Sequence, residues 1–440
     1  MTDALSRATY PGVRRTPDRL IVHIGLGAFH RSHQAWFTAR AHDGDRWAIT
    51  AYSGRRPDAA DALQAQDGLY TLIERGEGGD RATVMDIITE AVDGGDVDHL
   101  MRSVADPHTS VVTLTITEAG YEWSDELEAD RLLLAGVDRS ADDHPATALG
   151  RLALALDSRR LAGAGPVALV SCDNLPDNGA VLRAALRPLL DAIGPDTAAW
   201  VEESVGFVSS SVDRITPRST TADEETAEAL TGFRDPCVVV TEPFADWTMS
   251  DDFPAGRPAW ETAGARIVDD VEPFERRKLW LLNGAHTLLA AAGPGRGHAF
   301  VDEAFADPVL RSSVEGFWDE CVRHLPDDLD LDRYRADLAS RFGNSAIRHS
   351  LEQIATGAEA KLRVRILPVI AAERAAGRSG TAAAVALAAH LARLSDGRTP
   401  EHAAVRSALE RIADASVDDA VVDLVTDLIT TSRATSAPTH

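Results

Sequence analysis

The sequence predicts an α/β protein in which a Rossmann-like N-terminal domain is followed by a mostly α-helical C-terminal domain. Three observations lead to this fold class. Short apolar runs without polar alternation are separated by helix-like stretches in the first half, which is typical of a parallel sheet covered on both faces. The first of these runs ends in a glycine-rich turn, Gly25-Leu26-Gly27. From about residue 275 onward, helical periodicity dominates.

The periodicity also assigns the elements. The predicted strands cover residues 20–24, 47–52, 111–116 and 166–171. The predicted helices cover residues 33–40, 278–292, 308–324, 347–355 and 381–394. Residues 233–270 contain four prolines and are predicted to be connecting structure. We therefore expect a dinucleotide-binding domain at residues 1–220 and a helical substrate and catalytic domain at residues 221–440.

Composition excludes several classes of partner. The 440-residue chain carries 44 Lys and Arg against 69 Asp and Glu, a formal net charge of −25. A surface this acidic repels phosphate backbones and anionic lipids, so we expect no nucleic acid or membrane partner. No stretch supplies the roughly 20 uninterrupted apolar residues of a bilayer helix, and residues 1–20 do not resemble a signal peptide. Three cysteines without paired spacing predict neither a zinc site nor a disulfide framework, and we expect a cytoplasmic protein.

The turn at Gly25 and Gly27 predicts a dinucleotide site, because glycines let backbone amides approach a pyrophosphate at a helix N-terminus. His30 occupies the third glycine position of the usual fingerprint. No acidic residue follows the second strand to bind a ribose diol. Arg55 and Arg56 stand there instead, either as contacts for the 2′-phosphate of NADP or as solvated surface residues near Asp58, so the choice between NAD and NADP stays open.

Two further segments carry polar groups with catalytic potential. Asn174 follows the strand at 166–171 and could donate a hydrogen bond to a substrate oxygen, although loop chemistry alone also explains its neighbours. On an α-helix, Lys278, His286 and Asn283 would lie at roughly 0°, 80° and 140°, on one broad face. A lysine desolvated there has its pKa lowered toward neutrality and can act as a general base.

The alternative is a lysine whose stem follows an apolar helix beside a hydrogen-bonded core histidine. The chain has only two lysines, Lys278 and Lys361, which favours a functional role for Lys278. Asp213 and Arg214 are compatible with an ordinary ion pair near a domain junction.

Taken together, the motifs give the chain a family resemblance. It resembles the polyol-specific long-chain dehydrogenases and reductases, which include mannitol 2-dehydrogenase and fructuronate reductase. The matching blocks occur in the family's order at residues 23–35, 66–72, 115–121, 172–179, 212–217 and 278–286. The resemblance implies zinc-independent hydride transfer between NAD, or NADP, and a secondary alcohol carbon of an open-chain polyol or aldonate, with no metal site and a monomeric protein.

The resemblance also implies roles for individual residues. Lys278 would be the catalytic base, Asn174 and Asn283 would bind the developing alkoxide, and His286 would orient the substrate. Glu275 would assist proton exchange with solvent. Substrate-binding positions would be Asp213, Gln353 and Lys361. Cofactor-binding positions would be Gly25, Gly27, Phe29, Arg31 and Glu118.

One block departs from the mannitol 2-dehydrogenase pattern Arg-Ile-Ala-x-Asp-Gly-Ser-x-Lys. The corresponding run ends at Lys361, but it begins with Gln353 and lacks the Asp-Gly-Ser core. Gln353 resembles what some uronate-reducing members carry, so a keto-uronate such as fructuronate is an alternative substrate, and Lys361 is either a substrate contact or a surface lysine. Alternatives from other classes are a nucleotide-binding sensor without catalysis and an enzyme that uses Lys278 as a Schiff-base nucleophile.

Overall fold

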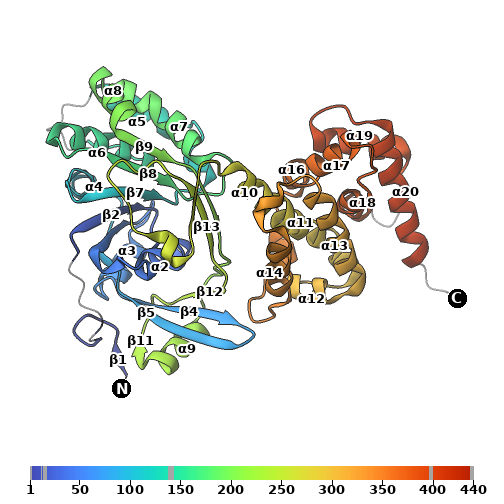
Figure 1. Cartoon of the computed structure of the whole chain (residues 1–440), viewed down its shortest axis with the longest axis horizontal. Helices are drawn as coiled ribbons and strands as arrows, with labels where there is room; N and C mark the ends of the chain where they lie inside the picture. The colour runs from blue at the N-terminus through green and yellow to red at the C-terminus, as the bar shows by residue number, and fades with distance from the viewer. Residues whose placement is uncertain (1, 11, 13–16, 137–142, 396–399, 437–440) are drawn as a thin grey trace. The chain divides into compact units, whose positions relative to one another are not determined.

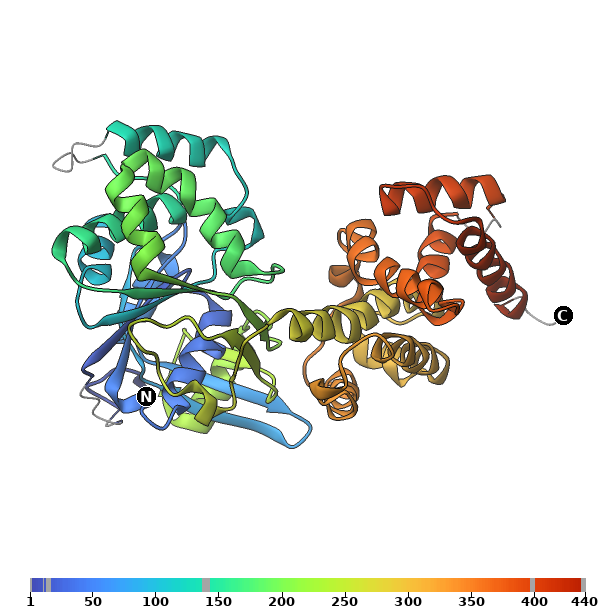
Figure 2. The same cartoon turned by 45° about the horizontal axis from the view of Figure 1, so that its top comes forward.

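The computed structural model describes residues 2–10, 12, 17–136, 143–395 and 400–436. The chain forms two compact units, Met1–Glu272 and Pro273–His440. Figures 1 and 2 show the first unit in blue through yellow-green and the second in yellow through red. In the described ranges, no helix has both the length and the apolar character needed to cross a bilayer.

The first unit is organised around a six-stranded parallel sheet with the strand order β6-β3-β2-β7-β8-β9. In chain order, its strands are β2 (Arg19–Ile24), β3 (Trp47–Tyr52), β6 (Ile88–Val92), β7 (Thr109–Leu114), β8 (Val167–Ser171) and β9 (Val205–Val208). This is the 3-2-1-4-5-6 order of a Rossmann fold, whose ligand crevice lies where the strand order reverses, here between β2 and β7. The predicted fold class is confirmed. The two edge strands escaped prediction because they are short or contain a charged residue.

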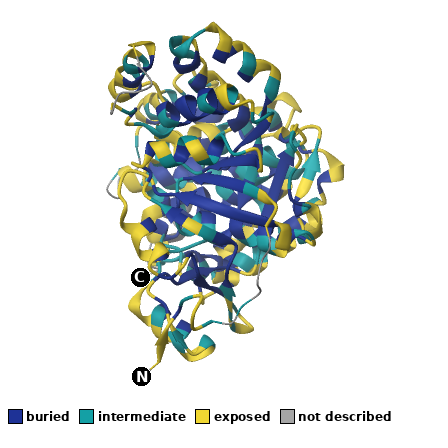
Figure 3. Ribbon diagram, turned by 90° about the vertical axis from the view of Figure 1, so that its left-hand side faces the viewer, coloured by how far each residue is buried: buried dark blue, intermediate teal, exposed yellow. Residues whose placement is uncertain are grey.

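Apolar side chains from both faces of the sheet form separate cores. On β2, Ile21 packs in one cluster, whereas Val22 and Ile24 pack in the other. The strands β3, β7 and β8 are buried along their whole length, and the sheet as a whole is mostly buried (Figure 3). The helices of this unit are α1 (Ala28–Ser32), α2 (Gln34–Arg40), α3 (Asp58–Gln64), α4 (Val97–Val104), α5 (Asp125–Gly136), α6 (Ala148–Ala162), α7 (Asn178–Ile193), α8 (Pro195–Ser204) and α9 (Thr221–Thr231). Helices α4 to α8 cover the face of Val22, and α2 and α3 cover the face of Ile21.

Residues after position 220 complete the first unit with short strands. One small sheet has the order β12-β4-β5, from Val239–Thr241, Tyr70–Gly76 and Gly79–Met85. A second has the order β10-β13-β14, from Ser210–Asp213, Asp246–Ser250 and Arg266–Val268, and β1 (Asp3–Ala4) pairs with β11 (Phe233–Arg234). The segment at 233–270, predicted to be connecting structure, thus supplies strands that pair with earlier parts of the chain. The expected boundary at 220/221 falls inside this unit.

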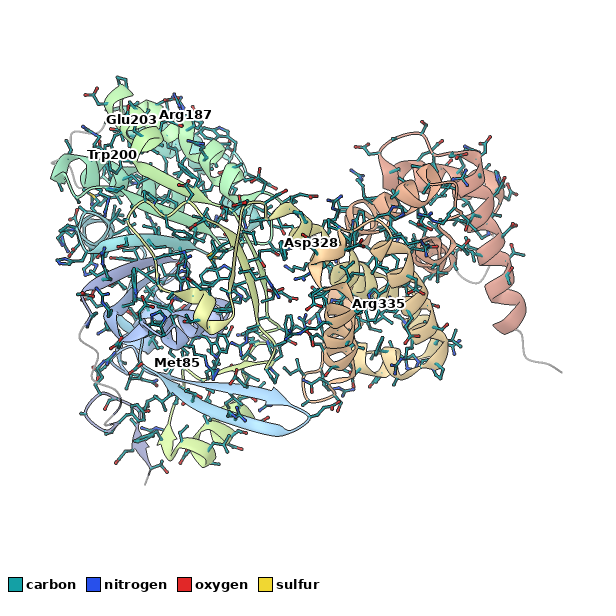
Figure 4. The ribbon with its side chains drawn as sticks, in the orientation of Figure 1. Met85, Arg187, Trp200, Glu203, Asp328 and Arg335 are labelled. Carbon is teal, nitrogen blue, oxygen red and sulfur yellow. The ribbon has the colours of Figure 1, made fainter. Side chains whose placement is uncertain are left out.

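The second unit is built mainly from helices in its described residues, with an isolated β-bridge between Phe300 and Ser350. Its regular elements are α10 (Glu272–Arg277), η4 (Lys278–Gly284), α11 (Ala285–Ala292), α12 (Val301–Ala306), α13 (Pro308–Val322), α14 (Leu331–Gly343), α15 (Leu351–Ala355), α16 (Ala358–Arg365), α17 (Leu367–Ala375), α18 (Thr381–Leu394), α19 (His402–Ala413) and α20 (Asp419–Ser436). Ion pairs link the helices, as between Arg335 of α14, labelled in Figure 4, and Asp319 of α13 at 2.8 Å. The predicted helix at 278–292 differs in one respect, because η4 is a π-helix.

Candidate functional site

The first unit contains a cavity of about 550 Å³ at the carboxyl ends of β2, β3 and β7. Gly25 and Leu26 line it from the turn after β2, and Thr115 and Thr117 line it from the segment after β7. This is the position at which Rossmann sheets bind dinucleotides, and the volume lies in the range of cofactor pockets. The residues present therefore fit a dinucleotide.

Gly25 is required at this turn for two reasons. Its φ of 110° disfavours any side chain, and a Cβ atom at this position would lie 2.1 Å from the carbonyl oxygen of Thr115. Thr115 also donates from Oγ1 to the carbonyl oxygen of Gly25 at 2.8 Å. Gly27 has an extended backbone at the N-cap of α1 and ample space around it. The turn is therefore packed directly against the end of β7.

His30, at the third glycine position, packs under the turn. Its ring stacks on His23 of β2 with a centroid separation of 3.3 Å, and both side chains are fully buried. Burial lowers the pKa of His23 to about 3. Burial, together with the neighbouring His23, lowers the pKa of His30 well below its ordinary value. Both rings are neutral near pH 7, so the helix approaches the strand through stacked imidazoles.

Three predicted cofactor residues are not among those that line the cavity. Phe29 stacks on His33, with ring centroids 4.9 Å apart. Arg31 donates to the carbonyl oxygens of Gly27 and Cys237 at 3.3 and 2.5 Å. Glu118 is exposed at the start of the short helix η2 (Glu118–Gly120), directly after Thr117.

The two arginines that follow β3 have different environments. Arg55 lines the cavity and forms an exposed ion pair with Glu126, another lining residue, at 3.1 Å. Arg56 pairs with Asp58 at 3.5 Å and is not among the lining residues. Of the pair, Arg55 is therefore the one that can contact a bound dinucleotide.

Two predicted residues of the first unit are not among those that line the cavity. Asn174 is exposed in the loop after β8. Asp213 ends β10 opposite Asp246 of β13 and is buried. The ion pair of Arg214 is made with Glu74, at 2.7 Å, and its guanidinium also donates to two backbone carbonyls.

In the second unit, Lys278 and Asn283 belong to the π-helix η4. Backbone hydrogen bonds in a π-helix join residues five apart, so Lys278 and Asn283 fall on the same side, whereas an α-helix would turn them roughly 140° apart. Two carbonyls of η4 also accept hydrogen bonds from side chains. Trp318 donates from Nε1 to the Leu281 carbonyl at 2.8 Å, and Thr287 donates from Oγ1 to the Asn283 carbonyl at 2.9 Å.

His286 follows in α11 and is buried against two rings. The ring centroids of Phe342 and His349 lie 4.8 and 5.0 Å from its own. Burial, reinforced by nearby His349 and by cationic side chains, lowers the pKa of His286 well below its ordinary value. A neutral imidazole can both donate and accept a hydrogen bond, which suits it to a substrate hydroxyl.

The remaining predicted residues of this unit lie on three different helices. Lys361 of α16 is half-buried and donates from Nζ to the Ile354 carbonyl at 2.8 Å, near the end of α15. Gln353 is exposed on α15, and Glu275 lies on α10, three residues before Lys278. Lys361 is therefore more than a solvated surface lysine.

Sequence reasoning missed several residues around the cavity. Thr117, Glu126 and Arg151 all line it. The place of Thr117, directly after a predicted strand, was a usable signal. Glu126 and Arg151 come from α5 and α6, whose approach to the cavity has no local sequence signal.

Comparison with known proteins matches both units. The model of the mannitol dehydrogenase Rossmann domain matches residues 19–262, and that of the mannitol dehydrogenase C-terminal domain matches residues 270–429. D-arabinitol 4-dehydrogenase of Ralstonia nicotianae is 39% identical over 391 residues, which are 86% of this chain and 83% of that protein. Mannitol 2-dehydrogenase of Aspergillus terreus is 36% identical over 367 residues, covering 80% and 73% of the two chains.

Solved structures give the same picture. The substrate-free structure of a D-sorbitol dehydrogenase has a TM-score of 0.84 at 28% identity and covers 96% of this chain and 94% of its own. Mannitol 2-dehydrogenase of Pseudomonas fluorescens, in a ternary complex with NAD and D-mannitol, has a TM-score of 0.78 at 30% identity, with 95% and 92% covered.

Proposed function

The chain belongs to the mannitol dehydrogenase family, and on that premise we propose that it is a zinc-independent oxidoreductase that transfers hydride between NAD and a secondary alcohol carbon of an open-chain polyol. The observation that carries the proposal is the cavity at the reversal of strand order, with Gly25 at its wall. The substrate class follows the relatives, which are named for arabinitol, mannitol and sorbitol.

We assign the cofactor to this cavity. Gly25 and Leu26 would border its pyrophosphate. Arg55 and Glu126 would line the side of the cavity next to the carboxyl end of β3. The nicotinamide ring accepts or supplies the hydride when the cofactor is bound. Gly27, Phe29, Arg31 and Glu118 are proposed as further contacts on the family pattern.

Proton transfer is assigned to the second unit. Lys278 would take the hydroxyl proton as general base, and Asn283, on the same side of η4, would donate a hydrogen bond to the alkoxide oxygen as negative charge develops. Asn174 would supply a second neutral donor. Glu275, three residues before Lys278, would return the proton to solvent.

Substrate orientation is assigned to the remaining polar residues. Neutral His286 would hydrogen-bond the hydroxyl at the reacting carbon without adding a positive charge. Asp213, Gln353 and Lys361 would bind the hydroxyls farther along the chain of the substrate. Because these residues are polar and two of them are charged, the proposal favours substrates with several hydroxyl groups.

The test is a spectrophotometric panel. Purified protein with NAD should gain absorbance at the reduced-nicotinamide band with at least one of D-arabinitol, D-mannitol and D-sorbitol, and with NADH it should lose absorbance with the matching ketose. Activity with fructuronate alone would move the substrate to the keto-uronates. No change with any of these compounds would contradict the proposal.

Cofactor choice is tested with the two arginines. Arg55→Ala should lower kcat/KM for NADP by roughly tenfold relative to NAD, because the mutation removes the one arginine of the pair that reaches the cavity. Arg56→Ala is the matched control and should leave the ratio unchanged. Equal effects of both variants would contradict the assignment.

We also propose that the protein works in the cytoplasm as a monomer. Cys172, Cys237 and Cys321 are buried and free, which supports a reducing compartment. Light scattering of the purified protein should give the mass of one chain, and a larger mass would contradict this part of the proposal.

A further inference from the structure

Thr117 adopts a backbone conformation that is populated almost only by glycine. Its φ is 68° and its ψ is 158°, and its side chain branches at Cβ, which adds steric conflict. Such conformations persist only where neighbouring groups enforce them, and they concentrate at functional sites. Thr117 lines the cavity assigned to the dinucleotide. Its surroundings must therefore supply the restraint.

The restraint comes from the Asp173 carboxylate. Oδ1 accepts a hydrogen bond from the backbone N–H of Thr117 at 2.8 Å, and Oδ2 accepts one from the N–H of Ile116 at 3.0 Å. The Tyr121 hydroxyl donates to Oδ2 at 2.6 Å. Hydrogen bonds to an ionised carboxylate are about twice as strong as neutral ones, so three of them can offset a strained backbone.

The Asp173 carboxylate and the Tyr121 hydroxyl are both buried, and a further hydrogen bond joins them to Ser171. Asp173 is 8% exposed and Tyr121 is 7% exposed. Because the Tyr121 proton is used on Asp173, Ser171 donates from Oγ to the Tyr121 oxygen at 2.8 Å. The end of β8 therefore holds the segment that follows β7.

The same segment also supports the glycine turn. Thr115 binds the Gly25 carbonyl, and Asn174 directly follows Asp173 in the chain. One carboxylate thus links the residues after β7, the glycine turn beyond them and the loop that carries Asn174.

We propose that Asp173 is a positioning residue, which forces Thr117 into a glycine-like conformation and thereby fixes the cavity wall and the adjacent Asn174 for cofactor binding and hydride transfer. The proposal rests on the proposed function, because it takes the cavity as the dinucleotide site. It predicts that Asp173 and Thr117 are coupled: the carboxylate is needed because residue 117 is not glycine.

The experiment is a double-mutant cycle with Asp173→Asn and Thr117→Gly, read out as the Kd of NADH by fluorescence and as kcat and KM for NAD. Asp173→Asn replaces one of the two carboxylate oxygens with an NH2 group and removes the negative charge, so the amides of Ile116 and Thr117 keep a single neutral acceptor between them and the backbone of Thr117 can relax to negative φ. We expect its Kd for NADH to rise by at least about tenfold. In the Thr117→Gly background, glycine adopts the conformation without steric cost, so the same change should raise the Kd less than about threefold.

Two further variants distinguish a specific effect on NADH binding from a general loss of stability. Tyr121→Phe keeps the ring and removes only one hydrogen bond to the carboxylate, so it should raise the Kd for NADH by roughly threefold and fold normally. Asp157→Asn is the matched control, because Asp157 is a buried carboxylate of α6 that accepts from Thr197 Oγ1 at 2.5 Å, outside the cavity lining. It should leave the Kd within about twofold of wild type.

Two results would overturn the inference. One is a Kd for NADH within about twofold of wild type in Asp173→Asn. The other is an equal loss with Thr and with Gly at position 117, which would mean that Asp173 has only a structural role. Failure of the proposed function is separate from both, because it would appear as absence of NADH binding in the wild-type protein.

Discussion

Lowering the pH from 7 to 5 should destabilise the first unit through the buried pair of His23 and His30. Both rings are neutral in the folded protein, since burial lowers the pKa of His23 to about 3 and that of His30 well below its ordinary value. In the unfolded chain, both histidines titrate with the ordinary pKa of about 6.5. Below that value the unfolded state binds more protons than the folded state, so stability falls as the pH drops.

The magnitude follows from the difference in pKa. For one histidine that stays neutral when folded, the free energy of unfolding decreases by roughly 2 kcal/mol between pH 7 and pH 5. The pair accounts for roughly 4 kcal/mol. His30→Phe retains a planar ring against His23 and removes one titrating group, so about half of the pair's pH dependence should disappear.

The assay is urea unfolding at pH 7 and pH 5, followed by tryptophan fluorescence. The comparison between wild type and His30→Phe cancels contributions from other groups. His42→Gln is the control, because it removes an exposed histidine outside the buried pair, and its stability loss between pH 7 and pH 5 should match that of the wild type. If His30→Phe loses as much stability on acidification as the wild type, the buried pair does not govern this response.

Two further predictions concern other positions. Gly25→Ala should weaken NADH binding by at least about tenfold and lower stability, because its Cβ would lie 2.1 Å from the Thr115 oxygen. Gly27→Ala should lower stability little, because the nearest atom would lie 3.7 Å from its Cβ. Equal losses of stability in denaturant for the two variants would refute this prediction. Burial raises the pKa of Glu373, but hydrogen bonds from Arg323, Arg378 and His324 outweigh burial and lower this pKa to about 2. The ionised carboxylate therefore stabilises the fold fully above about pH 4.5, and this stabilisation is lost progressively as the pH falls toward 2. Glu373→Gln should cost roughly 3 kcal/mol of unfolding free energy at pH 7 and clearly less at pH 3, and a cost independent of pH in urea unfolding would contradict it.

The central strands of the first unit were predictable because their chemistry is local. Residues 47–52 form β3 within the predicted limits, and the predicted strand at 111–116 is observed as Thr109–Leu114. Buried parallel strands need continuous apolar runs, which the sequence displays. The edge strands and the short strands after residue 220 depend on pairing with distant partners, so local pattern did not reveal them.

The candidate site was predictable only in part, for a similar reason. Gly25 could be identified because close backbone approach demands glycine. The role of Asp173 depends on a hydrogen bond to Thr117, across 56 residues. The π-helix at Lys278–Gly284 accepts a hydrogen bond from Trp318, which lies 37 residues from the carbonyl it binds. Helical periodicity predicted a helix there but assumed the wrong number of residues per turn.

The most direct test of the account is the rate of NAD reduction by the preferred polyol in Lys278→Ala. If Lys278 is the base, kcat should fall by at least about 100-fold while the Kd for NADH stays within about twofold of wild type. Lys361→Ala, which removes the other lysine of the chain, should chiefly raise KM for the polyol. A Lys278→Ala enzyme that retains kcat within about threefold of wild type would contradict the account.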